Sequence, residues 1–268
     1  MEPLVATQGV SMRASPIFVK FVWLVNPRRD AAMSRRSELR NLLAKWRRRK
    51  EPGDRNFVED GIVDEAGWDS ARVKLLFITK EPNDLRRGVR WSLTKFCARG
   101  GVQRGEKNYS PSWDLMARWV YGILSKDWPS WKEIEKLKHK FKDPKGRKPW
   151  LRQIAVINLK KSGGGGSTPQ GSLGERAQKH AQLLRRQISI IGPEVVICCG
   201  TGPEVFGKVY AKDEFSPERW DATSNGVQFT RHSEGGWFLF DYCHPQARWP
   251  HHFMYTMLML AVREVLGR

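Results

Sequence analysis

Three polar side chains stand where buried apolar runs of the chain end. Glu81 and His244 each lie two residues beyond such a run, and Asn158 is the last residue of another. In α/β proteins the ends of strands are where active sites assemble. A carboxylate, a carboxamide and an imidazole brought together there could bind a flat heteroaromatic ring and activate a water molecule beside it. We therefore expect these three residues to share one site.

The elements that must position these residues can be predicted from the hydrophobic pattern. Four short apolar runs indicate strands buried on both faces: 73–79, 153–158, 195–199 and 236–242. Helical spacing or helix-start signals predict the helices: about 34–50, 112–124, 130–141, from Ser172 to Ile191, after Gly202, and from Pro250 onward. Strands that alternate with helices predict an α/β fold, a three-layer α/β/α sandwich around a central, mainly parallel four-stranded sheet.

The charge balance points to a polyanionic partner. The chain of 268 residues has 47 Lys and Arg against 28 Asp and Glu, a net charge of +19. We expect DNA, double-stranded or single-stranded, to be that partner. Residues 1–55 are predicted to be a basic extension with one amphipathic helix, and 56–268 the α/β domain. That helix is open to two interpretations, a DNA-contacting element or a helix packed on the main domain with a solvated basic face.

Several classes of protein receive no support from the sequence. The four cysteines show neither a CxxC pair nor metal-ligand spacing with histidine, so no metal site and no cofactor are expected. Free cysteines in apolar runs are typical of a reduced, intracellular protein. With no leader peptide and no membrane span evident, we expect a monomer in the cytoplasm, associated with the nucleoid and not with a membrane.

The order and spacing of the polar segments resemble the uracil-DNA glycosylase superfamily. Thr79-Lys80-Glu81-Pro82 is similar to its first motif, Gly-x-Asp/Asn-Pro, and Asn158 matches the asparagine that ends its second strand. His244-Pro245-Gln246 is similar to its final His-Pro-Ser motif. The segment 88–92, which contains Trp91, is similar to the Gly-Leu-Cys-Phe-Ser segment of the classical enzymes. The resemblance covers about residues 56–268.

This resemblance implies a monofunctional DNA glycosylase that extrudes a base from DNA, hydrolyses its N-glycosidic bond and leaves an abasic site. Glu81 would orient a water and stabilise the sugar cation, and His244 would stabilise the departing base. The implied base-binding residues are Asn158, Trp91, Pro82 and Asn83, with Phe96 as an alternative to Trp91 for stacking. The implied DNA-binding residues are Arg248 or Trp249 as a wedge, Gln246 at the phosphate clamp, and Lys160, Lys161 and Ser162 in a cationic loop.

The substrate is left open by departures from the family pattern. Glu81 is longer than the usual Asp or Asn, so uracil specificity does not follow. Asn83 stands where the classical enzymes have a tyrosine that excludes bases with a 5-substituent. The substrate is therefore uracil or, preferably, a 5-modified cytosine such as a hydroxymethylated or glucosylated base of phage DNA, with a role in DNA repair or anti-phage defence. The alternative from another class is a non-catalytic nucleic-acid-binding module on the same fold.

Overall fold

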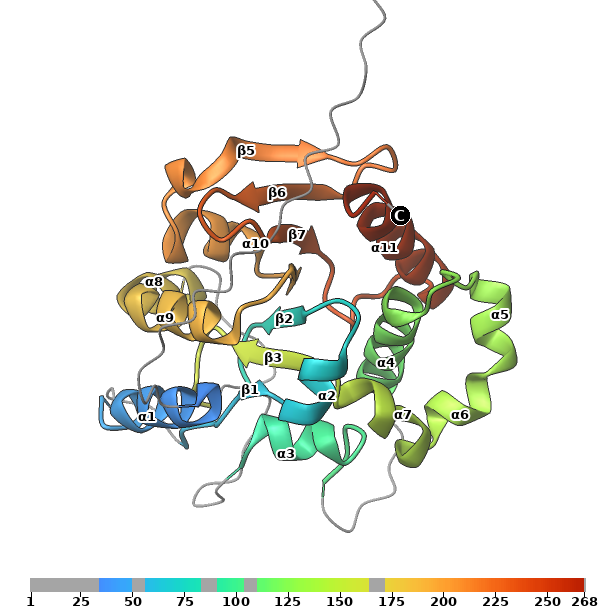
Figure 1. The fold of residues 1–268 in the computed structure, drawn as a ribbon, viewed down its shortest axis with the longest axis horizontal. Coiled ribbons are helices and arrows are strands. Elements are labelled where there is room, and N and C mark those ends of the chain that lie inside the picture. The colour runs from blue at the N-terminus through green and yellow to red at the C-terminus, as the bar shows by residue number, and fades with distance from the viewer. Residues whose placement is uncertain (1–33, 50–55, 83–90, 104–109, 164–171, 268) are drawn as a thin grey trace, which may run out of the picture. The chain divides into compact units, whose positions relative to one another are not determined.

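The protein is built around one mixed sheet of seven strands (Figure 1). The computed structural model describes residues 34–49, 56–82, 91–103, 110–163 and 172–267. The strand order is β1-β3-β2-β4-β7-β6-β5. The strands are β1 (Gly61–Ile62), β2 (Leu75–Thr79), β3 (Ile154–Asn158), β4 (Val195–Cys199), β5 (Phe215–Ala222), β6 (Gln228–His232) and β7 (Phe238–Tyr242).

The four predicted strands form the parallel centre of this sheet, in the order β3-β2-β4-β7. The prediction of a four-stranded sheet is wrong, because β1, β6 and β5 extend it with antiparallel pairings on both sides. Strand β1 has only two residues, and β5 is exposed along most of its length. Neither strand contains the continuous apolar run that is typical of a strand covered on both faces. The hydrophobic pattern therefore did not predict them.

Helices cover both faces of the sheet. Phe77, Val156 and Ile197 point to one face and pack with α4 (Pro111–Leu124) and α11 (His251–Val265). The same layer contains α3 (Leu93–Ala98), α5 (Trp131–Lys136), α6 (Lys138–Lys142) and α7 (Pro144–Leu151). The alternate residues of the strands pack on the other face with α1 (Arg35–Arg47), α2 (Glu65–Ser70), α8 (Ser172–Lys179) and α9 (Ala181–Ile191). The period-2 alternation of strand side chains thus builds two cores.

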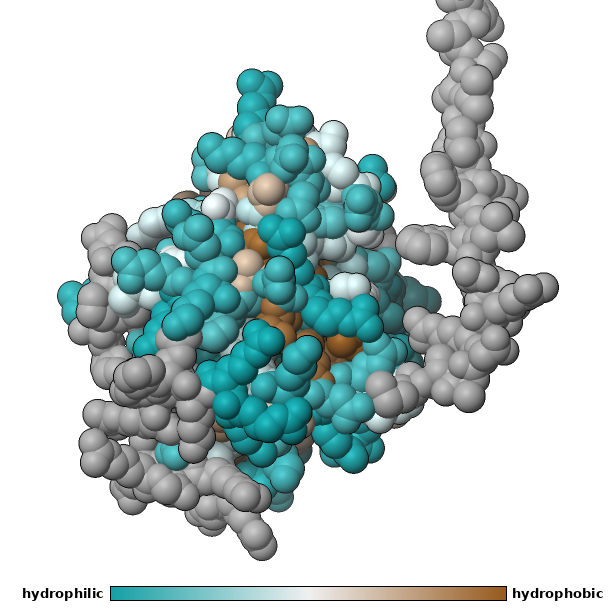
Figure 2. All heavy atoms as spheres, turned by 90° about the vertical axis from the view of Figure 1, so that its left-hand side faces the viewer, coloured by the Kyte–Doolittle hydropathy of each residue, from teal (hydrophilic) through white to brown (hydrophobic). Residues whose placement is uncertain are grey.

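Helix α1 is packed into the second of these cores. Leu39, Leu43 and Trp46 are buried, whereas Arg40 and Lys45 are exposed. The interpretation as a packed helix with a solvated basic face is therefore confirmed. The compact unit of the chain covers Met33–Arg268, so α1 belongs to the α/β domain. The side of the molecule that includes α1, α8 and α9 is largely hydrophilic, with apolar atoms showing in a narrow strip (Figure 2).

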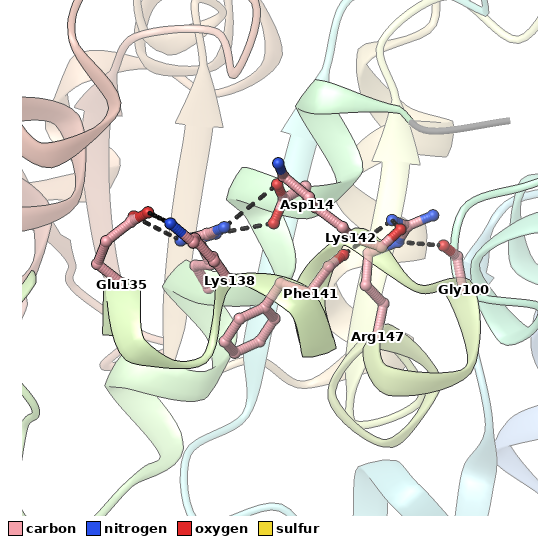
Figure 3. A network of polar contacts seen from close by, with 8 residues as sticks. Gly100, Asp114, Glu135, Lys138, Phe141, Lys142 and Arg147 are labelled. Atoms are coloured by element: carbon pink, nitrogen blue, oxygen red, sulfur yellow. Dashed lines mark hydrogen bonds and ion pairs between the residues drawn. The ribbon is translucent and has the colours of Figure 1, made fainter. Parts of the chain in front are cut away.

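Two buried arginines hold the helical corner formed by α4, α5, α6 and α7 (Figure 3). The Arg118 guanidinium donates to Asp114 at 2.8 Å and to Glu135 at 3.3 Å. The Arg147 guanidinium donates to three backbone carbonyls, those of Gly100, Phe141 and Lys142, at 2.6, 2.9 and 2.9 Å. The stretch predicted as one helix over 130–141 is divided at Leu137 into α5 and α6. Buried guanidinium donors therefore satisfy carbonyls that the short helices leave open.

Candidate active site

The predicted site residues meet at the edge of the sheet where the central strands end. Strands β2 and β3 run parallel with Thr79 opposite Asn158, and β4 runs parallel to both β2 and β7. The backbone N–H of Lys160 donates to the carbonyl of Lys80 at 3.0 Å, which carries the β2–β3 pairing beyond the strand ends. Because the carboxyl ends of parallel strands share one edge, the segments that bear Glu81, Asn158 and His244 all leave the sheet at this edge, with the turn after β4 between the Glu81 and His244 segments.

Glu81 is held in an ion pair. Its carboxylate lies 2.6 Å from the Lys160 ammonium, and its side chain is 6% exposed while that of Lys160 is 20% exposed. A charge-assisted contact of this kind restrains the carboxylate more than a neutral one would. Lys160, predicted as a DNA contact, thus stands at the carboxylate that was predicted to activate water.

The backbone of Asn158 is fixed on both sides. Its N–H donates to the Asp60 carboxylate at 2.8 Å, and its carbonyl accepts from the Lys161 ammonium at 2.8 Å. Its side-chain oxygen accepts from the Thr79 hydroxyl at 2.5 Å. Its side-chain Nδ2 is buried and has no hydrogen-bond partner among the residues that the structure describes. A buried amide that leaves a donor unpaired is unusual in a folded protein and is a feature of sites that receive a ligand.

Asp60 and Lys161 form a buried ion pair behind Asn158. The two atoms Lys161 Nζ and Asp60 Oδ2 are 2.7 Å apart, and Gln187 of α9 donates to the same carboxylate at 2.8 Å. The Lys161 ammonium also lies 4.8 Å from the centre of the Trp46 ring. Burial lowers the pKa of Lys161, and Asp60 opposes that effect.

The burial of Lys161 and Ser162 does not favour the prediction that their side chains contact DNA. Both residues are buried, Lys161 at 5% and Ser162 at 4% exposure. The charge of Lys161 is compensated inside the protein by Asp60 and cannot reach a phosphate. Lys161 was predicted to lie in a surface loop because it follows a strand. The chain instead directs its side chain into the core beneath α1 and α9.

His244 is held as a neutral imidazole with its proton on Nε2. The backbone N–H of Gln246 donates to His244 Nδ1 at 3.1 Å, so that nitrogen must be the unprotonated one. Burial lowers the pKa of His244, and the positive charge of Lys80 lowers it further. The imidazole therefore presents an N–H donor at neutral pH.

The turn after β4 brings Lys80 and His244 together. Gly200 has φ +68°, and a Cβ at this position would lie 3.5 Å from Lys80 Cε and 3.9 Å from His244 Cβ. Its N–H donates to the carbonyl of Tyr242 at 2.6 Å. The left-handed conformation at Gly200 is what allows the β4 turn to lie between the segments that follow β2 and β7.

The aromatic candidates lie beside one another, Trp91 just before α3 and Phe96 within it. The ring centres of Trp91 and Phe96 are 5.4 Å apart, and Phe96 packs in turn on Trp113. The Trp91 indole N–H is buried without a hydrogen-bond partner. Pro82 is buried, and Asn83 lies outside the described residues. Trp91 and Phe96 thus form one aromatic cluster with Trp113.

The segment after His244 is exposed. Gln246 and Arg248 are exposed, and the side chain of Trp249 is 53% exposed and packs edge-on against Phe253. These two rings border a hollow of about 470 Å³ that Tyr242 and Cys243 also line. Their position allows them to meet a large partner beside the His244 segment.

Comparison with known proteins assigns no relative to this chain: no protein-family model matches it, and no curated protein matches it. Within the described ranges, no helix combines the length and apolar character needed to cross a membrane. The same ranges hold no group of three or more His, Cys, Asp or Glu side chains that could bind a metal ion.

Sequence reasoning missed three participants in the site: Asp60, Thr79 as a partner of Asn158, and Lys160 as a partner of Glu81. One signal was available for Thr79, because it is the last residue of β2 and lies in register with the last residue of β3. No comparable signal marks Asp60, which precedes a two-residue strand.

Proposed function

We propose that this protein is a monofunctional DNA glycosylase, similar to the uracil-DNA glycosylase superfamily, that extrudes a pyrimidine and hydrolyses its N-glycosidic bond. The observation that carries the proposal is the position of Glu81, Asn158 and His244 at or just after the carboxyl ends of β2, β3 and β7, three parallel strands of one sheet with β4 between β2 and β7. A carboxylate, an amide with an unpaired buried donor and a neutral imidazole together match the needs of this reaction. The net charge of +19 supports DNA as the partner.

In the proposed reaction a water oxygen attacks C1′ of the sugar while the bond from C1′ to the base nitrogen breaks. The bonding electron pair leaves with the base, and the water proton passes to the Glu81 carboxylate. Positive charge develops on the sugar before attack, as in glycosidases. Lys160, 2.6 Å from Glu81, holds the carboxylate in place. Its charge opposes that of the sugar cation, so we propose that a DNA phosphate draws the Lys160 ammonium away as substrate binds.

His244 acts on the departing base. The base carries negative charge on an oxygen, and an N–H aimed at that oxygen contributes a few kcal/mol, about 3 kcal/mol for one donor in an oxyanion site. The hydrogen bond from Gln246 to Nδ1 leaves Nε2 to supply this donor. The lowered pKa of His244 suits a donor that stays neutral.

DNA contacts complete the proposal. Trp91 or Phe96 supplies the stacking face, worth about 1–3 kcal/mol for one base. Arg248 or Trp249 fills the space that the extruded base leaves, since both are exposed just beyond His244. Gln246 lies at the phosphate backbone in this arrangement.

The proposed substrate is a pyrimidine with a 5-substituent, preferably hydroxymethylcytosine or its glucosylated form. This part rests on Asn83, a small polar residue where the classical enzymes carry an excluding tyrosine. Such bases occur in some phage DNA, which would give the protein a role in anti-phage defence. Asn83→Tyr should abolish release of the modified base and leave release of uracil unchanged; equal losses on both would contradict this choice of substrate.

The proposed activity is tested with duplexes that carry one uracil, one hydroxymethylcytosine or one glucosylated hydroxymethylcytosine. Abasic sites are scored after incubation with the wild-type protein and with Glu81→Gln, which keeps the shape of the side chain and removes its charge. We expect abasic sites with the wild type and at least a hundredfold lower rate with the variant. If the wild type releases no base, or if the variant matches it, the proposal fails.

One observation favours a second candidate, a non-catalytic nucleic-acid-binding module. The Glu81 carboxylate is already engaged by Lys160 and nearly buried, as in a structural ion pair. In that case Glu81→Gln would leave DNA affinity unchanged and no duplex would yield abasic sites. The same assay therefore separates the two candidates.

A further inference from the structure

The side-chain amide of Asn158 is held in one of its two orientations. Its oxygen and the Thr79 hydroxyl are 2.5 Å apart. This separation is at the short end of the range for O–H···O hydrogen bonds and below the range for N–H···O hydrogen bonds. The hydroxyl has another neighbour, the carbonyl of Ile157, but that contact is longer at 3.3 Å. Its single proton is therefore directed to the amide oxygen, and the amide nitrogen takes the other position.

The backbone of Asn158 is fixed as well, so a backbone shift cannot reorient the side-chain amide. Asp60 and Lys161 bind the N–H and the carbonyl of Asn158, and the residue is 2% exposed. The remaining group is Nδ2, a buried donor for which the described part of the chain provides no acceptor. The unmet demand at this point of the site is for a hydrogen-bond acceptor.

We infer that Thr79 is a specificity-determining residue: its hydroxyl fixes the Asn158 amide so that the site discriminates 4-amino from 4-oxo pyrimidines. This inference rests on the proposed function and goes beyond it, because it assigns base selection to a residue on a neighbouring strand. Thr79 acts through Asn158 and is a positioning residue.

The chemistry of the two base classes explains the discrimination. In cytosine-type bases position 3 is an acceptor and position 4 carries an amino donor, whereas in uracil-type bases position 3 is a donor and position 4 an acceptor. An amide in one orientation matches the first pattern, and an amide turned by 180° matches the second. A fixed amide thus serves one class well, and a site that leaves a polar group unpaired rejects the other class.

The test compares 5-hydroxymethylcytosine with 5-hydroxymethyluracil in otherwise identical duplexes, each with the hydroxymethyl group free or glucosylated. These bases share the 5-substituent and differ only along the edge that Asn158 would read. Single-turnover excision rates are measured for the wild type, for Thr79→Val, which keeps the shape and removes the hydroxyl, and for Thr79→Ser, which keeps the hydroxyl. Thr79→Ala replaces the valine variant if that one does not fold, as judged by thermal melting.

We expect the wild type to excise one of the two base classes at least about tenfold faster than the other. In Thr79→Val this ratio of excision rates should fall by about three- to tenfold, which is the effect of one net hydrogen bond. In Thr79→Ser the ratio should stay at its wild-type value. A general loss of structure would lower both rates and leave the ratio unchanged. If the wild type treats both classes equally, or if the valine and alanine variants retain its ratio, the inference is overturned while the proposed glycosylase stands. If no base is released from any of the four duplexes or from a duplex that carries uracil, the proposed function itself fails.

Discussion

Lys160 and Lys161 are adjacent in the chain and form two ion pairs of different character. Lys160 joins Glu81 at the edge of the sheet, where the two side chains are 20% and 6% exposed. Lys161 joins Asp60 behind β3, where the side chains are 3% and 0% exposed. The chain bends after β3, and the two adjacent side chains leave this bend toward different partners, one ammonium to Glu81 at the site and the other to Asp60 in the core.

The two ion pairs have different roles in the protein. The Asp60–Lys161 pair also binds both backbone groups of Asn158 and receives Gln187, so breaking it disturbs the frame on which the site is built. The Glu81–Lys160 pair has a carboxylate next to the proposed reacting atoms. We therefore expect stability to depend on the first pair and activity on the second.

The largest effect should come from Glu81→Gln. Removal of the carboxylate charge should lower the rate of base release by a factor of about 10²–10⁴, because the general base and the stabilising anion are lost together. The measurement is single-turnover release of the base. The matched control is Glu59→Gln, which removes a carboxylate paired with Arg47 and about half exposed. A similar loss in the control would show that the effect is not specific to the site.

Lys161→Met should lower the free energy of unfolding by about 3–5 kcal/mol, because Asp60 would remain buried without its counter-ion. Lys160→Met should cost about 1 kcal/mol, since that pair lies where solvent reaches it. Urea unfolding of the two variants, followed by circular dichroism, provides the comparison. Equal costs would mean that the two pairs do not differ as the structure indicates.

Arg248→Ala should weaken DNA binding by about 1 kcal/mol and reduce the slope of the salt dependence by about one unit, because one positive charge at the DNA is lost whether or not Arg248 is the wedge. Affinity is measured by fluorescence anisotropy at several salt concentrations. Arg219→Ala, an exposed position on the edge strand β5, is the control and should leave the affinity unchanged. An equal effect at both positions would indicate binding by overall charge alone.

The smallest effect should be a change in the titration of His244. Burial and the charge of Lys80 lower its pKa, so the neutral form is present above that pKa and is lost as the pH falls through it. Lys80→Met removes the second cause and should raise the pKa toward its usual value. The acid limb of activity should then move to higher pH. NMR titration of the imidazole measures the change, with Lys95→Met as control; an unchanged or lowered pKa would contradict the structure.

The hydrophobic pattern allowed the central strands and the position of the site to be predicted. The four apolar runs became β2, β3, β4 and β7, and the predicted helix at 34–50 became α1. Glu81, Asn158 and His244 were found at strand ends because parallel strands place their carboxyl ends together. Strands β1, β5 and β6 were missed because none of them has the continuous apolar run of a strand buried on both faces: β1 has only two residues, and most residues of β5 and several of β6 are exposed or polar.

The amino-acid sequence by itself thus determined the parallel centre of the sheet and the candidate carboxylate, amide and imidazole, since these follow from local patterns of apolar and polar residues. Only the tertiary structure decided how the polar groups pair. It separated Lys160 from Lys161, joined Asp60 to a residue 101 positions away and set the Thr79 hydroxyl against the Asn158 amide. Such pairings depend on which segments meet in space and on the free-energy cost of burying a charge or an amide without a partner. The spacing of residues along the chain predicts neither of these.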